Sequence, residues 1–285
     1  MVVFRWIACS IPFAKTGFFC DDDEIRYPHR EDTISSHLMT VIFGIISIIL
    51  FLSTEYSLVR HLSRKSKRVH RESDKLLHPA IENFFYLISM IICGNLATSA
   101  IINIGKRTMS RPRPNFISVC QPNLTALCPP GESHKFVEDY ECHGEFSEEQ
   151  YFSFPSGHAS HAVFLGIFLI MYIQKRCKFP DPVRSLIQLI LASFVCFICT
   201  SRVRDFKHRL SDVGGGVLVG TAMGLFFITH VANFFRHARY QTTDQGAEKG
   251  YHCIENGQTS TDIDNFLPKV NISRSVSDYG SLVSE

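Results

Sequence analysis

The sequence predicts an all-α fold, a polytopic membrane helix bundle with about six transmembrane helices, of which the first is short or truncated. Long apolar stretches recur along the 285 residues, and about 18 such residues can cross a hydrocarbon core of roughly 30 Å. Basic residues concentrate in alternate loops between these stretches, and cysteines collect in the remaining loops. The mean hydropathy of +0.06 hides this pattern, because polar segments dilute the apolar ones.

Five apolar stretches are long enough for full spans once their flanking residues are included. They are Ser36–Val59, Ala80–Ile104, Ala159–Ile173, Ser185–Thr200 and Val213–Phe235.

The N-terminal segment Met1–Ala14 is a sixth candidate. It carries Arg5, and as a helix it would reach only about 21 Å at 1.5 Å per residue. We interpret it as a shortened transmembrane helix rather than a signal sequence, because no clear cleavage site follows an apolar centre.

The charge of the loops predicts the orientation of the helices. The segment Arg60–Lys75 contains seven Lys and Arg residues, and the connections Lys175–Arg184 and Arg236–Arg239 are also basic. Short basic loops face the cytoplasm, and these three alternate as such loops must. The other connections, including Gly105–Ser156 and Ser201–Asp212, then lie on the extracellular or lumenal side. The plasma membrane is the favoured location, with internal membranes as the alternative.

The outer loops fit an oxidising compartment. Four of the ten cysteines lie there, Cys20, Cys120, Cys128 and Cys142, but the sequence does not say which of them pair. The longest outer loop also carries an N-glycosylation sequon at Asn123.

Composition divides the chain after residue 236. Residues 1–236 are predicted to form a membrane-embedded domain, whereas residues 237–285 are polar and are predicted to form a disordered cytosolic tail. The net charge of +2 is too small to predict nucleic-acid binding. The bilayer is the expected environment, and the sequence is compatible with a homo-oligomer.

The first cluster of charged residues is GKRTMSRPRPNF, Gly105–Phe116. It lies on the outer side, where the preference of cytoplasmic loops for positive charge cannot explain it. Lys106 and Arg113 are seven residues apart, and Pro114 fixes the backbone after Arg113. A guanidinium offers a planar fork to phosphate oxygens and an ammonium adds a point charge, so both residues are candidates for anion binding.

The second cluster is YFSFPSGHASH, Tyr151–His161, at the entrance to an apolar stretch. Ser156 is a candidate helix N-cap, and Gly157 lets a ligand approach free N–H groups at the helix start. His158 would then stand beside a bound anion and donate a proton. The alternatives are a plain capping turn with an incidental histidine, or a metal site shared with His161, which the surrounding cations disfavour.

The third cluster is SRVRDFKHRLSD, Ser201–Asp212, between two apolar stretches. His208 and Asp212 are four residues apart, so we expect them on one helical face, with the carboxylate accepting a hydrogen bond from the imidazole. The other ring nitrogen would remain free as a nucleophile, and Arg202 adds a fixed cation. The alternative is a membrane-edge loop whose basic residues only anchor two helices. An unused His–Asp pair there would cost desolvation, which favours a site.

In order and spacing, these clusters resemble the three signature motifs of the type 2 phosphatidic acid phosphatase superfamily. The matching stretches are Lys106-x6-Arg113-Pro114, Pro155-Ser156-Gly157-His158 and Ser201-Arg202-x5-His208-x3-Asp212. The outer loop Gly17–Pro28 is similar to that of the animal lipid phosphate phosphatases, a branch with six membrane helices. The resemblance covers about residues 15–236, and the short N-terminus departs from it.

The resemblance implies a phosphatase domain over residues 1–236 that uses no metal and no cofactor. The implied substrates are membrane lipid phosphates: phosphatidic acid, lysophosphatidic acid, sphingosine 1-phosphate and ceramide 1-phosphate. His208 is the implied nucleophile and forms a phosphohistidine, Asp212 orients it, and His158 is the general acid and base. The residues implied to hold the phosphate are Lys106, Arg113, Ser156, Gly157 and Arg202.

Two other functions remain open from the sequence. A non-catalytic relative that acts in adhesion or signalling would keep the fold and lose motif residues, whereas His158, His208 and Asp212 are all present. A transporter of an anionic solute would spread its cations through the depth of the membrane, whereas these cations cluster at one face.

Overall fold

The computed structural model describes residues 10–12, 15–65, 73–131, 134–145, 147–177, 179–231, 240–241 and 252–253. The chain divides into two units, Met1–Phe235 and Arg236–Glu285. In the second unit the described residues form two short antiparallel strands, β3 (Tyr240–Gln241) and β4 (His252–Cys253). The rest of the predicted tail, 237–285, lies outside the described residues.

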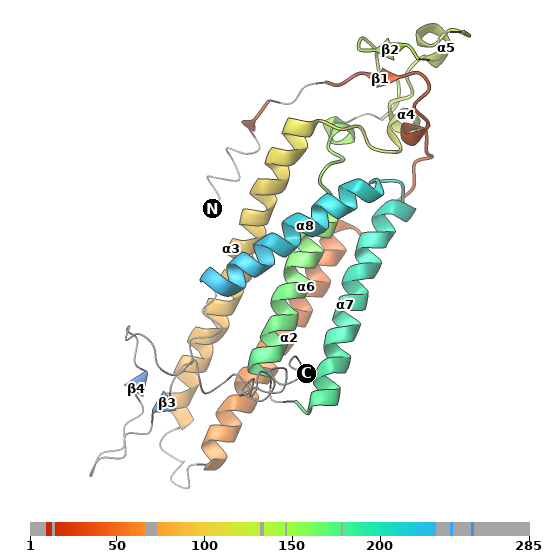
Figure 1. Ribbon diagram of the computed structural model, residues 1–285. Helices are drawn as coiled ribbons and strands as arrows, with labels where there is room; N and C mark the ends of the chain where they lie inside the picture. Colours follow the sequence, from red (N-terminus) through yellow and green to blue (C-terminus); the bar gives the residue numbers. More distant parts are fainter. Residues whose placement is uncertain are drawn as a thin grey trace, which may run out of the picture. The chain divides into compact units, whose positions relative to one another are not determined.

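Long helices form most of the first unit (Figure 1). They are α2 (Ser36–Lys65), α3 (Ser73–Met109), α6 (Gly157–Arg176), α7 (Asp181–Arg204) and α8 (Leu210–Phe226), which continues as a π-helical turn, η3 (Phe227–Val231). Each of these five helices is long and apolar enough to cross a membrane, which confirms the five predicted spans. The predicted short helix Met1–Ala14 lies largely outside the described residues.

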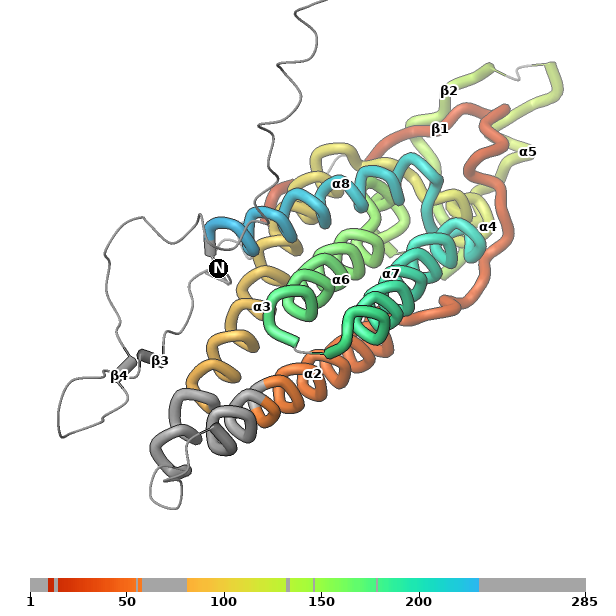
Figure 2. The backbone as a smooth tube through the Cα atoms, turned by 60° about the horizontal axis from the view of Figure 1, so that its bottom comes forward, coloured from red at the N-terminus to blue at the C-terminus, as the bar shows by residue number. Residues whose placement is uncertain are grey.

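Helix α6 lies at the centre of the bundle and packs against α2, α3, α7 and α8 (Figure 2). Its aromatic residues Phe164, Phe168 and Tyr172 are completely buried. The surrounding helices instead expose large apolar side chains, such as Ile49 on α2 and Leu189 on α7. A helix that is apolar on all sides needs an apolar environment on its outer face as well, and the lipid bilayer supplies it.

Helices α6 and α8 approach closely because α8 presents glycines to α6. A Cβ atom on Gly216 would lie 2.6 Å from the carbonyl oxygen of Ser156, and one on Gly220 would lie 2.5 Å from that of Ser160. Small residues spaced four apart let two helix backbones come together in a membrane. This contact holds the first turn of α6 against the first turns of α8.

A small subdomain lies at the end of the bundle where α6 and α8 begin, and we call it the outer subdomain because it lies beyond the helix ends (Figure 1). Its elements are β1 (Phe18–Phe19), η1 (Asp23–Ile25), α4 (Phe116–Cys120), α5 (Leu124–Leu127), β2 (Phe136–Val137) and η2 (Glu148–Tyr151). Strands β1 and β2 pair antiparallel, and the subdomain has its own aromatic core. Disulfides join Cys20 to Cys128 and Cys120 to Cys142, which supplies the pairing that the sequence left open.

Candidate active site

Five helix ends meet beside the outer subdomain, including the start of α2 at Ser36. Helix α3 ends there at Met109, α6 begins at Gly157, α7 ends at Arg204 and α8 begins at Leu210 (Figure 1). The predicted catalytic and phosphate-binding residues lie on or next to these ends: Lys106, Arg113, Ser156, Gly157, His158, Arg202, His208 and Asp212. The fold therefore brings together three motifs that are far apart in the sequence.

His208 is buried and bonded to the backbone of the second motif. Its Nδ1 atom lies 2.7 Å from the carbonyl oxygen of Ser153. A carbonyl oxygen only accepts, so Nδ1 carries the proton, and the neutral ring has its unprotonated nitrogen at Nε2. Burial lowers the pKa of His208 well below 6.5, and the charges of Arg113 and Lys106 lower it further. At neutral pH His208 is therefore an uncharged imidazole with a lone pair on Nε2.

The structure corrects the direct hydrogen bond that the sequence predicts between Asp212 and His208. Helix α8 begins at Leu210, so His208 lies before the helix, and a spacing of four residues does not place the pair on one helical face. The buried Asp212 carboxylate instead accepts hydrogen bonds from the Ser153 hydroxyl and from the backbone N–H of Arg209. Because Ser153 also holds His208, the two residues are linked through a shared neighbour.

Arg111 belongs to this network, and the sequence analysis missed it. Its Nη1 atom donates to Asp212 Oδ1 at 2.9 Å and to the Ser211 hydroxyl at 2.9 Å. Its carbonyl oxygen accepts the backbone N–H of Ser153. A fully buried carboxylate requires a partner of opposite charge, and Arg111 provides it. The order of contacts is therefore Arg111, Asp212, Ser153 and His208.

Three buried polar groups in the predicted phosphate-binding set have no hydrogen-bond partner within the described residues. They are the hydroxyl of Ser156, Nε of Arg113 and Nε of Arg202. Each group can donate a hydrogen bond, and buried donors in folded proteins are nearly always paired. They come from three separate segments of the chain. An anion with several acceptor oxygens is the kind of ligand that would satisfy them together.

The start of α6 adds further donors. Ser156 occupies the N-cap position and makes no side-chain capping bond to the described chain. The first N–H groups of a helix have no partner within the helix, so the N–H of Gly157 can donate to a ligand. Lys106 Nζ lies 3.7 Å from the point where a Cβ of Gly157 would stand. The N–H of Ser156 donates to the carbonyl oxygen of Asp212 at 3.0 Å, which fixes this turn against α8. The helix N-terminus and the ammonium group both favour an anion here.

His158 lies in the first turn of α6, next to these donors. Its Nε2 atom is 3.3 Å from the hydroxyl oxygen of Ser36, at the start of α2. His161, one turn further on, has its ring nitrogens 2.9 Å from Asn95 Oδ1 and 3.2 Å from the Ser99 hydroxyl oxygen. The two histidines therefore contact different helices. No group of three or more His, Cys, Asp or Glu residues in the described part of the chain could hold a metal ion.

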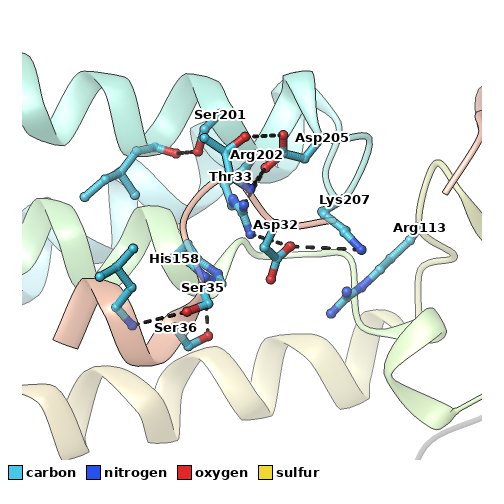
Figure 3. A network of polar contacts seen from close by, with 12 residues as sticks. Asp32, Thr33, Ser35, Ser36, Arg113, His158, Ser201, Arg202, Asp205 and Lys207 are labelled. Carbon is cyan, nitrogen blue, oxygen red and sulfur yellow. Dashed lines mark hydrogen bonds and ion pairs between the residues drawn. The ribbon is translucent and has the colours of Figure 1, made fainter. Parts of the chain in front are cut away.

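Acidic residues that the sequence did not single out lie among the cations (Figure 3). Asp32 Oδ1 accepts a hydrogen bond from Arg202 Nη1 at 3.1 Å and lies 4.0 Å from Lys207 Nζ. Arg202 Nη2 donates to the buried Asp205 at 2.7 Å. Asp205 also accepts hydrogen bonds from the N–H and the hydroxyl of Thr33. Arg202 is thus fixed between two carboxylates.

Asn123 lies away from this site, exposed at the start of α5 in the outer subdomain. The hydroxyl of Thr125 donates to Asn123 Oδ1 at 2.7 Å. Its exposure leaves the predicted glycosylation site accessible.

Comparison with known proteins agrees with these motifs. The sequence profile of the PAP2 superfamily matches residues 83–236. Phospholipid phosphatase 1 of Mus musculus is 33% identical over 230 residues, covering 79% of this chain and 77% of the relative. Phospholipid phosphatase 2 of Homo sapiens is 29% identical over 263 residues, with 87% and 84% covered. No solved structure shows significant similarity. With its five apolar helices and its three motifs at one end of them, the chain is an integral membrane protein that belongs to the PAP2 superfamily.

Proposed function

We propose that the protein is a metal-independent phosphatase that hydrolyses lipid phosphate monoesters through a phosphohistidine intermediate. The observation that carries this proposal is the set of three buried donors without described partners, on Ser156, Arg113 and Arg202. They accompany a neutral, buried His208 whose Nε2 is unprotonated. Phosphate oxygens would satisfy the donors, and phosphorus would be the target of the nucleophile. The curated relatives are named phospholipid phosphatases, which supports the same function.

The five predicted phosphate-binding residues form what we call the phosphate cradle: Lys106, Arg113, Ser156, Gly157 and Arg202. Phosphoryl transfer is catalysed mainly by positioning and by neutralising charge on the equatorial phosphate oxygens. Donors that are already fixed and shielded from water need no reorganisation when that charge develops. The buried guanidinium groups of Arg113 and Arg202 fit this task.

In the first step, Nε2 of His208 attacks phosphorus and forms a P–N bond while the P–O bond to the lipid alcohol breaks. His158 donates a proton to the departing oxygen, so that a neutral alcohol leaves. The Ser153 carbonyl keeps the Nδ1 proton in place and stabilises the positive charge that develops on the ring. Asp212 and Arg111 act through Ser153 and orient His208.

In the second step, His158 accepts a proton from a water molecule as this water attacks phosphorus. The P–N bond breaks, the electron pair returns to Nε2 of His208, and inorganic phosphate leaves. His158 then carries the proton needed for the next turnover, so the cycle is balanced without a metal ion or a cofactor.

The location of the site supports a lipid substrate. The cradle lies at the ends of helices that are long and apolar enough to cross a membrane. A lipid monoester could present its phosphate at this level while its acyl chains stay in the bilayer. The substrates that we propose are phosphatidic acid, lysophosphatidic acid, sphingosine 1-phosphate and ceramide 1-phosphate.

We also propose that the site faces the extracellular or lumenal side, with the plasma membrane as the location. The basic segment between α2 and α3 is expected in the cytoplasm, which puts the opposite helix ends outside. The two disulfides of the outer subdomain support an oxidising compartment. Asn123 is then a glycosylation site. Residues 1–236 form the phosphatase domain, and residues 237–285 form a cytosolic tail.

The experiment that tests the function measures phosphate released from phosphatidic acid by the purified full-length protein, in detergent micelles that contain EDTA. We expect release at the same rate with and without the chelator. Release that stops in EDTA would indicate a metal-dependent phosphatase. No release under either condition would favour the catalytically inert relative.

A further inference from the structure

Asp32 places a negative charge beside the cations of the site. The side chains of Arg202 and Lys207, from the stretch Ser201–Asp212, and of Arg113, from a separate loop, are directed toward it (Figure 3). The bond from Arg202 Nη1 measures 3.1 Å, and the Lys207 ammonium lies at 4.0 Å. Burial lowers the pKa of Arg113, whereas the negative charges of Glu149 and Asp32 raise it. The Asp32 carboxylate is therefore within electrostatic reach of two guanidinium groups of the phosphate cradle.

A carboxylate and a phosphate group offer the same kind of acceptor to a guanidinium. Asp32 Oδ1 accepts a hydrogen bond from Nη1 of Arg202. The proposed function assigns this same guanidinium to the phosphate. A phosphate dianion in the cradle would meet a like charge from Asp32 at close range, which is unfavourable to both. Asp32 thus places one anion where the substrate would bring another.

The Asp32 side chain can rotate away from Arg202 while the backbone of the next residue stays in place. The next residue, Thr33, is fixed to Asp205 by its N–H at 2.8 Å and its hydroxyl at 2.7 Å. The Asp32 side chain itself is 35% exposed, so a rotation can bring it to water. Asp205 continues to hold Arg202 at 2.7 Å, so this cation keeps its position when Asp32 moves.

We propose that Asp32 is an internal anion that occupies the phosphate cradle in the substrate-free protein and that the phosphate of the substrate displaces. Asp32 is thereby an affinity-determining residue of the site. The work of displacement weakens the binding of the lipid phosphate and, equally, of the product phosphate, which favours product release. This inference rests on the proposed function, because it concerns the same site.

A purely structural role for Asp32 predicts the opposite result. If its carboxylate stayed in place to position Arg202 during turnover, removal of the charge would leave that guanidinium less well held. Phosphate binding would then become weaker or stay the same.

The test is the substitution Asp32→Asn in the full-length protein. The measurements are KM for a short-chain phosphatidic acid and the inhibition constant of inorganic phosphate. We expect both constants to fall about fivefold. This factor corresponds to the free energy of a partly exposed ion pair, which no longer has to be broken when phosphate binds. The increase in melting temperature caused by inorganic phosphate should also become larger, because tighter binding to the folded state stabilises it more.

Asp22→Asn is the matched control. Asp22 lies in the same N-terminal segment, its side chain is 32% exposed, and it pairs with Arg209 Nη2 at 3.8 Å, outside the cradle. Like Asp32→Asn, the substitution Asp22→Asn removes one negative charge, and it does so at the same end of the helix bundle. We expect no change in KM or in the inhibition constant of inorganic phosphate. An equal gain in both variants would show a general charge effect and overturn the proposal.

The outcomes separate this inference from the proposed function. Phosphate release by the native protein together with unchanged or weaker phosphate binding in Asp32→Asn overturns only the inference. If the native protein releases no phosphate, the proposed function fails, and the melting-temperature shifts still decide whether Asp32 competes with an anion. If Asp32→Asn does not fold, Asp32→Ser, which is shorter and also uncharged, replaces it in the same comparison.

Discussion

The proposed nucleophile side of the site, which consists of His208, Ser153 and Asp212, and the proposed phosphate cradle differ in how far their polar groups are satisfied. His208, Ser153 and Asp212 are all buried, and their side chains bond to partners within the chain. In the cradle, Ser156 and Arg113 carry buried donors that have no partner among the described residues. The polar groups of the first half are thus satisfied within the chain, whereas the second half keeps donors that lack acceptor oxygens among the described residues.

This difference separates two tasks of the enzyme. A fixed nucleophile needs no reorganisation when it attacks, and so contributes to the rate of the chemical step. In the proposed function, the donors that lack partners in the described chain gain them when phosphate binds, and those bonds strengthen as charge develops in the transition state. Substitutions on the nucleophile side should therefore change kcat, and substitutions in the cradle should change kcat/KM.

The largest effect is expected from Arg113→Lys in the cradle. Lysine keeps the charge but loses the planar guanidinium whose Nε is buried without a partner in the described chain. We expect kcat/KM for phosphatidic acid to fall roughly 100-fold, as when one donor to a developing charge is lost. Arg184→Lys, at the far end of α7 where Arg184 pairs with Asp181, should leave kcat/KM unchanged. A loss of less than threefold in Arg113→Lys would contradict the role of the cradle.

A smaller effect, confined to kcat, is expected from Arg111→Met. The change removes the cation that holds Asp212 and keeps an unbranched, uncharged side chain in place of the arginine stem. We expect kcat to fall about tenfold with KM within twofold of the native value, because Asp212 no longer fixes Ser153 and His208. Arg111→Lys should restore part of the loss. A rise in KM at unchanged kcat would instead show that Arg111 binds the phosphate.

The smallest effect concerns stability in acid. Burial lowers the pKa of His208 well below 6.5, so below pH 6.5 the unfolded chain binds a proton that the folded protein does not. Stability from this residue is complete above pH 6.5 and is lost as the pH falls toward its folded pKa. We expect the melting temperature in detergent to fall by about 2–4 °C more in the native protein than in His208→Asn between pH 7 and 5. Parallel curves for the two proteins would contradict a buried, neutral His208.

Much of the architecture was predictable because it depends on local composition. The long apolar stretches determine α2, α3, α6, α7 and α8, and their alternation brings the ends that carry Lys106, His158 and His208 to one side. The order and spacing of the three motifs also predicted the family, which the comparisons confirm. These features are readable because each belongs to one continuous segment.

What could not be predicted depends on contacts between segments. The link from Asp212 to His208 was predicted as a helical pair, but the chain is extended at Arg209 and the helix starts only at Leu210. Ser153 therefore became the common partner. The pairing of four cysteines likewise depends on how the outer loops pack against each other.

The contacts of Asp32 and Arg111 in the site could not be predicted from the sequence for the same reason. Asp32 lies in an outer loop with several acidic residues, and nothing local distinguishes it from them. Its place beside Arg202, 170 residues away, exists only in the folded chain. Arg111 stands two residues before Arg113, and the sequence does not show which of the two contacts Asp212.

In the proposed mechanism, His208 carries the phosphoryl group during turnover. The most direct measurement is rapid quenching of the native protein with phosphatidic acid labelled at phosphorus, followed by mapping of the labelled peptide under alkaline conditions, which preserve a P–N bond. We expect label on His208 of the native protein, released by acid, and no label in His208→Asn. Label on another residue, or full activity in His208→Asn, would contradict it.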